Sequence, residues 1–178
     1  MALTSTPREL LFHGCSISNS GTRCHKRGTK VGDLSEHFSK AEFACHCCGE
    51  LSLEGGLIEA LEQLRALAGK EIIVHDGYRC PTHNQKVGGV PDSEHTRGMA
   101  ADIAIPGLSL QQMYELALQV PTFCNGGIGA YDSVFLHLDN RPHPARWARV
   151  RGQYVSIQHL VTAPVSLLAK VQTGSQPA

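Results

Sequence analysis

The sequence has no excess of charge of either sign and no long hydrophobic run. Lysine plus arginine number 16 and aspartate plus glutamate number 16, so the formal net charge is zero. A chain without a basic surplus has no electrostatic reason to bind nucleic acid or an anionic membrane. No apolar stretch approaches the ~20 residues of a membrane-spanning helix. We therefore expect no nucleic-acid partner and no membrane span.

The N-terminus also lacks the features of a secretory signal. Residues 1–20 have no basic start followed by an unbroken apolar core. We therefore expect the chain to be made in the cytoplasm as a soluble protein. The cysteines number 7, which is odd, so they cannot all pair within one chain. Without a secretory signal, reduced thiols or metal ligands are favoured over a disulfide framework.

The length and composition indicate one domain with a core of its own. The chain has 178 residues, of which 42% are hydrophobic, as is ordinary for a globular domain. Residues 1–32 are polar and basic with little apolar periodicity, so we predict a poorly ordered extension there. Residues 33–152 form the predicted domain. Residues 153–178 mix apolar stretches with a polar end and are predicted as a C-terminal tail.

Hydrophobic spacing predicts two helices and a buried strand between them. An apolar stripe at helical spacing predicts a helix with Ser52 as its N-cap and Gly69 as its end. Residues 72–74 are typical of a buried strand, and Ser109 and Gln112 have the spacing of a capping box that begins the second helix. The stripe consists of Leu57, Ile58, Leu61, Leu64 and Leu67.

Residues 126–139 indicate two short strands around a turn at Asp132 and Ser133. In the second strand, His137 and Asp139 alternate with two leucines. Because the side chains of a strand alternate between its faces, His137 and Asp139 share one face and the leucines occupy the other. We expect polar chemistry on one face and the core on the other.

The 10 histidines of this short chain raise the question of metal binding. In the segment SEHTRGMAAD, residues 93–102, small residues and Gly98 separate His95 from Asp102. Such an imidazole and carboxylate can bind one zinc ion, while the small residues let the backbone turn close to it. Catalytic zinc usually has three protein ligands and keeps a fourth position for water. His137 is the expected third ligand.

A hydrolase built on such a site also needs a base for the water and a cation for the developing oxyanion. Asp139 is the candidate base, and Arg79 is the candidate cation. The residues alone leave simpler interpretations open for both. Asp139 could end its strand or hold a histidine ring, and Arg79 could pair with a nearby carboxylate.

Three segments in order carry a resemblance to a known family. GYRCPTHN, SEHTRGMAADI and GGIGAYDSVFLHLD resemble the zinc D-Ala-D-Ala carboxypeptidase family of peptidoglycan peptidases. The resemblance extends over residues 35–147. The family's signature is Ser-x-His-x-x-Gly-x-Ala-x-Asp, and its fixed positions are matched by Ser93, His95, Gly98, Ala100 and Asp102.

This resemblance implies a fold and a set of residue roles. The fold is α+β, with a small, mainly antiparallel sheet that carries the zinc and is flanked by helices, as in lysostaphin-like peptidases and the hedgehog signalling domain. His95, Asp102 and His137 correspond to the zinc ligands. Arg79 corresponds to the arginine that polarises the scissile carbonyl, and Ser93 to a substrate-positioning residue.

The resemblance further implies a zinc metallopeptidase that hydrolyses amide bonds in peptidoglycan peptides, as a carboxypeptidase or an endopeptidase. We expect a monomer that acts on the cell wall, and a phage-associated lytic enzyme would fit the missing signal. Two other classes stay open. One is a zinc-containing binding module of the same fold that has lost catalysis, and the other is a structural-zinc or redox module built on the cysteines.

One position departs from the family pattern. Many members have a catalytic glutamate three residues before the last zinc histidine, where this chain has Val134. Asp139, two residues after that histidine, is therefore the predicted base. Glu94 and His75 are the alternatives.

The segment CHCCG at residues 45–49 predicts a second, structural zinc site. Cys45 and Cys48 have the C-x-x-C spacing of zinc knuckles, although no second such pair follows. We expect Cys80 and Cys124 to be buried or unpaired thiols instead. The expected ligands of the second zinc are Cys45, Cys47, Cys48 and His37.

Overall fold

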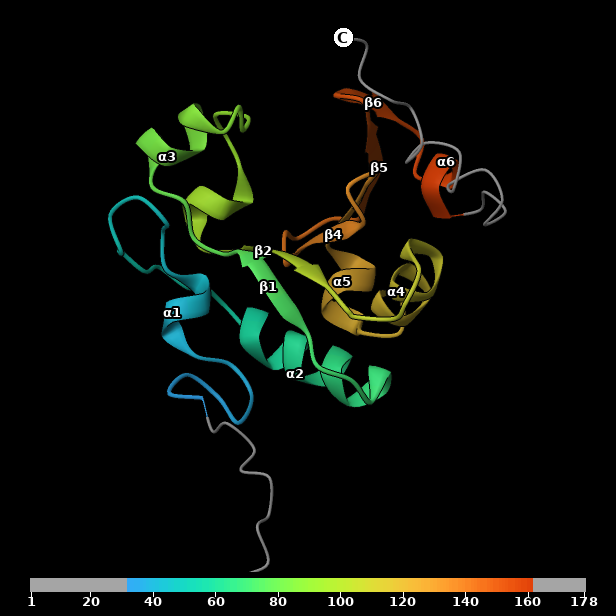
Figure 1. Ribbon diagram of the computed structural model, residues 1–178, viewed down its shortest axis with the longest axis horizontal. Helices are drawn as coiled ribbons and strands as arrows, with labels where there is room; N and C mark the ends of the chain where they lie inside the picture. The colour runs from blue at the N-terminus through green and yellow to red at the C-terminus, as the bar shows by residue number, and fades with distance from the viewer. Residues whose placement is uncertain (1–31, 162–178) are drawn as a thin grey trace, which may run out of the picture.

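The computed structural model describes residues 32–161, which form a six-stranded sheet with helices packed against it (Figure 1). Most of the N-terminal extension and of the C-terminal tail predicted from the sequence lies outside these residues. Among residues 32–161, no helix has the length and apolar character needed to cross a membrane.

The sheet has the strand order β1-β2-β4-β3-β5-β6. Its neighbouring strands are antiparallel except for β3 and β5, which are parallel. This architecture confirms the predicted α+β class with a mainly antiparallel sheet. The strands are β1 (Ile73–Asp76), β2 (Ala100–Ala104), β3 (Gly127–Tyr131), β4 (Phe135–Asp139), β5 (Ala145–Val150) and β6 (Gln153–Val155).

The apolar side chains of the helices and of the sheet form one core. Leu136 and Leu138 of β4 are fully buried in that core, together with side chains from the packed helices. Because neighbouring residues of a strand point to opposite faces, His137 lies on the other face, as predicted. The helices are α1 (Lys40–Phe43), α2 (Leu57–Ala68), α3 (Pro81–Lys86), the 3-10 helix η1 (Glu94–Arg97), α4 (Leu110–Ala117), α5 (Pro121–Asn125) and α6 (Gln158–Val161).

Helix α2 ends at Gly69 as predicted, but it begins later than expected. Its N-cap is Gly56, with a left-handed φ of 80°, and the predicted N-cap Ser52 is wrong. Ser52 belongs to a segment that packs against the turn at Gly98, where Glu54 N–H donates to the Gly98 carbonyl at 2.9 Å. This long-range contact holds residues 51–54 outside the helix.

Two other predicted elements have the expected form. Helix α4 begins with the predicted capping box, in which Ser109 N–H donates to Gln112 Oε1 at 2.9 Å and Gln112 N–H donates to Ser109 Oγ at 3.3 Å. Strands β3 and β4 pair antiparallel from Tyr131 opposite Phe135 to Gly127 opposite Asp139. The predicted hairpin over residues 126–139 is therefore confirmed.

Residues 153–161, for which the sequence predicted only a tail, continue the fold. Strand β6 pairs antiparallel with β5. Leu160 and Val161 of α6, with Ile157 before it, are buried in the core. These apolar positions explain why the folded part extends past residue 152.

Candidate metal centre

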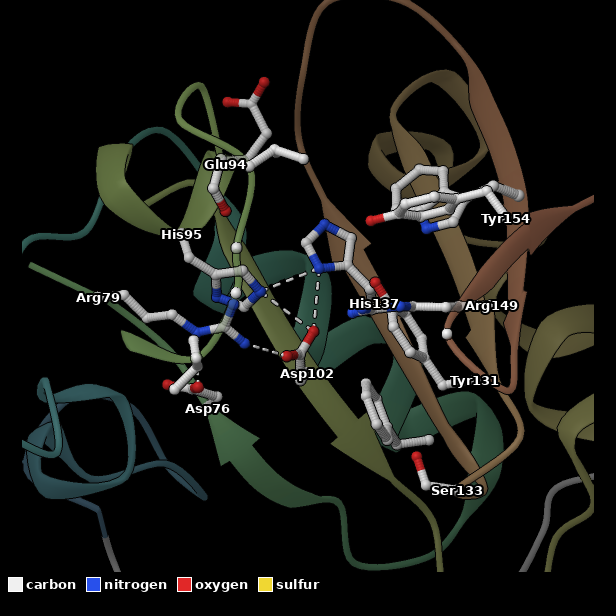
Figure 2. A pocket seen from close by; sticks show the side chains of 18 of the residues that line it. Asp76, Arg79, Glu94, His95, Asp102, Tyr131, Ser133, His137, Arg149 and Tyr154 are labelled. Atoms are coloured by element: carbon white, nitrogen blue, oxygen red, sulfur yellow. Dashed lines mark hydrogen bonds and ion pairs between the residues drawn. The ribbon is translucent and has the colours of Figure 1, made fainter. Parts of the chain in front are cut away.

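The three predicted metal ligands come together on the sheet face opposite the buried leucines of β4. His95 Nε2 lies 3.1 Å from Asp102 Oδ1 and 3.0 Å from His137 Nδ1. His137 Nδ1 lies 3.0 Å from the same Asp102 oxygen. Figure 2 shows the two imidazoles and the carboxylate pointing toward one another. We call His95, Asp102 and His137 the donor triad.

Strand pairing and one turn explain how residues so far apart in sequence meet. Asp102 on β2 and His137 on β4 are direct partners in the antiparallel register. His95 lies on η1, which ends at Gly98 with a left-handed φ of 70°. A side chain on Gly98 would come within 2.3 Å of the Ser52 carbonyl oxygen, so a glycine is required there. This explains the glycine between the first two ligands.

Burial and mutual contact set the charge states within the triad. Burial raises the pKa of the Asp102 carboxyl, but the neighbouring His95 and His137 outweigh it and hold this pKa far below its usual range. Burial lowers the pKa of His137, whereas hydrogen bonds to Asp102 and Asp139 raise it, with a net result of about 9. Near neutral pH the metal-free centre thus pairs an anionic carboxylate with a protonated His137.

The triad fits a zinc ion by its donor chemistry and by the contacts behind it. Two imidazoles and one carboxylate are a ligand set of catalytic zinc. A zinc-binding histidine usually uses its second ring nitrogen to bind a carbonyl or carboxylate, which fixes the ring. His95 Nδ1 lies 2.6 Å from the Gly77 carbonyl oxygen, and His137 Nε2 lies 3.0 Å from Asp139 Oδ2. Both rings are therefore held with one nitrogen toward the centre.

Arg79, the predicted cation, lies beside the triad. Its Nη2 donates to Asp102 Oδ2 at 2.5 Å, and its Nε donates to Asp76 Oδ2 at 2.6 Å (Figure 2). Asp76 ends β1, so the sheet holds the carboxylate that orients the guanidinium. The arrangement leaves a fixed positive charge at the centre. The simpler interpretation of Arg79, a pairing with nearby carboxylates, is therefore also present in the structure.

Asp139, the predicted base, lies behind His137, on the ring nitrogen that faces away from the triad. Its carboxylate is fully buried and accepts hydrogen bonds from Gly127 N–H at 2.9 Å and from Arg141 Nε at 2.8 Å. Burial raises the pKa of Asp139, but His137 and Arg141 lower it well below the usual range. Because its oxygens already accept several hydrogen bonds, the Asp139 carboxylate favours the alternative role, in which it holds the His137 ring.

The other candidates for the base differ in their access to the centre. Glu94 lines the cleft above the triad and is largely buried. His75 packs edge-on against Phe135, with ring centroids 6.2 Å apart. Val134, where the family has its glutamate, is at the β3–β4 turn with a φ of 66° and is 41% exposed.

Ser93 and Asn84 lie near the centre in different ways. Ser93 precedes η1, is buried and lines the same cleft as the triad. Asn84 Nδ2 donates to the Val90 carbonyl at 2.8 Å, which ties α3 to the loop that follows it.

The comparison with family models decides the relationship of the chain. Residues 36–139, which contain the whole triad, match the model of the family described as Peptidase M15. The chain belongs to the M15 peptidases. The predicted resemblance to the zinc peptidoglycan peptidases is thereby confirmed.

Several relatives of this M15 chain share one name with each other. The peptidoglycan L,D-endopeptidase MepK of Escherichia coli K12 is 33% identical over 99 residues, and those of Escherichia coli O157:H7 and Shigella flexneri are similar to the same degree. The match covers 51% of this chain and 53% of each relative, so the chain spans about half the length of these proteins.

The cleft of this M15 peptidase has a second wall that the sequence analysis did not identify. The cleft has a volume of about 700 Å³, and β5 and β6 supply Trp147, Arg149 and Tyr154 to its lining. Arg149 and Tyr154 lie on the far side of His137 from Arg79 (Figure 2). The alternation of Trp147 and Arg149 around buried Ala148 is the strand signal that could have indicated them.

The contacts of two residues, His37 and Cys80, bear on the predicted ligand set of the second zinc site. His37 Nδ1 lies 2.7 Å from Glu62 Oε2, so this ring pairs with a carboxylate of α2 instead of joining the cysteines. Cys80, expected to be a buried or unpaired thiol, is partly buried and unpaired, and its Sγ lies 3.3 Å from Cys47 Sγ. The cysteine cluster consists of Cys45, Cys47, Cys48 and Cys80.

Proposed function

We propose that this M15 peptidase is a zinc-dependent hydrolase of amide bonds in peptidoglycan peptides. The observation that carries the proposal is the donor triad, three metal-binding side chains from separate elements that meet in a cleft beside a fixed arginine. The name of the MepK relatives, peptidoglycan L,D-endopeptidase, supports the substrate class.

In this proposal the triad holds the metal and Arg79 assists the carbonyl. A zinc ion bound by His95, Asp102 and His137 would supply a Lewis acid and an activated water. Arg79 would donate to the oxygen on which negative charge develops, because its contact with Asp102 places the guanidinium beside the triad. The rigid pairing of Arg79 with Asp76 keeps that donor in position before the substrate arrives.

We assign the proton transfers and the positioning of the ring to different carboxylates. Glu94 lines the cleft, and we propose that it carries the proton to the leaving amine. Asp139 holds His137 through Nε2 and is a positioning residue. Ser93 on the same wall is the proposed contact for the substrate backbone.

The lining of the cleft supports a short peptide as substrate. Arg149 offers a guanidinium group for a carboxylate of the substrate, whereas Arg79 and Arg141 already pair with carboxylates of the chain. Trp147 and Tyr154 provide flat apolar surfaces for the peptide between these charges. Terminal and internal amide bonds are both compatible with this lining, and the released product distinguishes an exopeptidase from an endopeptidase.

The test is amine release from purified peptidoglycan by zinc-loaded protein, chelated protein and the variant His95→Ala, with His159→Ala as a matched control at an exposed position of α6. We expect release by wild type and His159→Ala only, and restoration of the chelated wild type by zinc. Mass analysis of the fragments identifies the bond. Zinc-loaded wild type that binds peptidoglycan fragments but releases no amine would overturn the proposal in favour of a non-catalytic binding module, the reading that Val134 in place of the glutamate keeps open.

A further inference from the structure

The cysteine cluster brings together two segments that are distant in sequence. Cys45, Cys47 and Cys48 lie on the loop that follows α1, and Cys80 is the N-cap residue of α3. All four sulfur atoms lie within 4.8 Å of one another. In Figure 1 the loop after α1 reaches the segment that leads from β1 to α3.

The sulfur separations match a tetrahedral metal site. A zinc–sulfur bond is about 2.3 Å long, so neighbouring sulfurs of a tetrahedron are about 3.8 Å apart. Cys45 Sγ lies 3.6 Å from Cys47 Sγ, and Cys47 Sγ lies 3.3 Å from Cys80 Sγ. A disulfide would need two sulfurs at about 2.05 Å, and these cysteines are all unpaired.

The backbone around the cluster is arranged to support sulfur as an acceptor. Cys80 N–H donates to Cys45 Sγ at 3.4 Å, and His83 N–H donates to Cys80 Sγ at 3.4 Å. Hydrogen bonds of this kind stabilise the negative charge of a thiolate. The loop itself is closed by Cys45 N–H, which donates to the Glu50 carbonyl at 2.8 Å, and by Gly49 with a φ of 73°.

From this geometry we propose that Cys45, Cys47, Cys48 and Cys80 bind a structural zinc ion, separate from the one in the cleft. Tetrahedral sites with four thiolates are typical of structural zinc, and they leave no open position for a substrate. The ligand set excludes His37 and replaces it with Cys80.

The zinc would fasten the loop after α1 to the turn that carries Arg79. Cys80 directly follows Arg79, and Tyr78 N–H donates to the Phe43 carbonyl at 2.8 Å. Gly77 packs so closely on Phe43 that an added side chain would lie 2.5 Å from the Phe43 Cα. The metal therefore completes a contact that holds the arginine of the cleft in place.

The test is the zinc content of the full chain, purified under reducing conditions, in wild type, His95→Ala, Cys80→Ser and the control Cys124→Ser. We expect two zinc ions per chain in wild type and Cys124→Ser, and one in each of the other two variants. Cobalt substitution should give thiolate charge-transfer absorption in His95→Ala and none in Cys80→Ser. The zinc content of His95→Ala can be measured without any peptidase activity. The proposed thiolate site and the proposed peptidase function can therefore fail separately.

A second measurement covers the event that Cys80→Ser does not fold. Titration of zinc-loaded wild type with a mercurial thiol reagent should release one of the two zinc ions. A His95→Ala protein without zinc, iron instead of zinc at the thiolates, or a Cys47–Cys80 disulfide in peptide mass analysis would each overturn the proposal.

Discussion

The donor triad and the cysteine cluster are built in different ways from the same short chain. The triad takes one side chain each from η1, β2 and β4, all of them buried, on the wall of a cleft. The cysteine cluster takes three of its four thiols from one loop, and two of these, Cys47 and Cys48, are exposed. The sheet therefore determines the first arrangement, whereas the second depends on a loop with little regular structure.

This difference corresponds to a difference in what each group can do. Three ligands leave a coordination position for water or substrate, whereas four thiolates close the metal off. The rigid sheet can hold the triad together before metal binds, because hydrogen bonds already join its members. The loop is held by its sulfur contacts and by a few backbone hydrogen bonds, such as that from Cys45 N–H to the Glu50 carbonyl at 2.8 Å. We therefore expect removal of the cleft metal to abolish activity, and removal of the thiolate metal to loosen the structure.

The largest expected effect is the loss of activity in His137→Ala. Its product formation should fall to the level of chelated wild type, because one zinc ligand is lost. The thermal midpoint should stay within a few degrees of that of zinc-loaded wild type, since the core face of β4 and the cysteine cluster are both unchanged. Calorimetry together with amine release checks both quantities. A large drop in the thermal midpoint would mean that the triad is as structural as the cysteine cluster.

The next effect is expected for Arg79→Lys. Lysine retains the charge but cannot donate to Asp76 and Asp102 at once, as Arg79 does. We expect kcat/KM to fall by about 10²–10³, the range found when one oxyanion donor is removed. Zinc content should be unchanged. The control Arg65→Lys on α2, outside the cleft, should behave as wild type, and equal activity of the two variants would remove Arg79 from the mechanism.

Asp139→Asn distinguishes a positioning residue from a base. If Asp139 holds the His137 ring, zinc affinity should fall about 10–100-fold, the usual effect of losing such a contact. A base would lower kcat and leave zinc affinity unchanged. Zinc titration against a competing chelator measures the affinity. Glu94→Gln is the matched variant, and for it we expect normal zinc affinity with reduced kcat.

The sequence could predict the three residues of the triad because short stretches of it carry the relevant patterns. His95 and Asp102 lie within one ten-residue motif, and strand alternation alone assigned His137 to the polar face. The same alternation could not assign the role of Asp139. It identifies the shared face but does not reveal that His137 turns Nε2 toward Asp139 and Nδ1 toward the triad.

Long-range contacts account for what the sequence did not predict. Ser52 has the chemistry of an N-cap, but its segment is bound to the turn at Gly98. The fourth thiol of the cysteine cluster is Cys80, 33 residues from its contact Cys47 and without a second cysteine beside it. A search for paired C-x-x-C motifs cannot find such a thiol. The folded structure reveals it, because Cys80 Sγ lies beside Cys47 Sγ.

The smallest effect concerns the carboxylate that keeps His37 away from the cysteine cluster. Glu62 accepts hydrogen bonds from Ser35 Oγ at 2.6 Å and from His37 N–H at 2.9 Å. Partial burial raises its pKa, but these bonds and the His37 ring outweigh it, so the net pKa is lowered. We expect Glu62→Gln to cost about 1 kcal/mol of unfolding free energy at neutral pH, with exposed Glu59→Gln near zero.

The pH dependence of this effect has a definite sign. Because the folded pKa of Glu62 is lowered, its stabilisation is complete above the unfolded pKa of about 4.3 and is lost as the pH falls through the folded pKa. The difference between wild type and Glu62→Gln in urea unfolding should therefore shrink toward acidic pH. Zinc content should be equal in the two proteins. Loss of the thiolate zinc from Glu62→Gln would instead show that His37 and the cysteine cluster form one unit. That outcome would contradict the assignment of the four cysteines, without His37, as the zinc ligands.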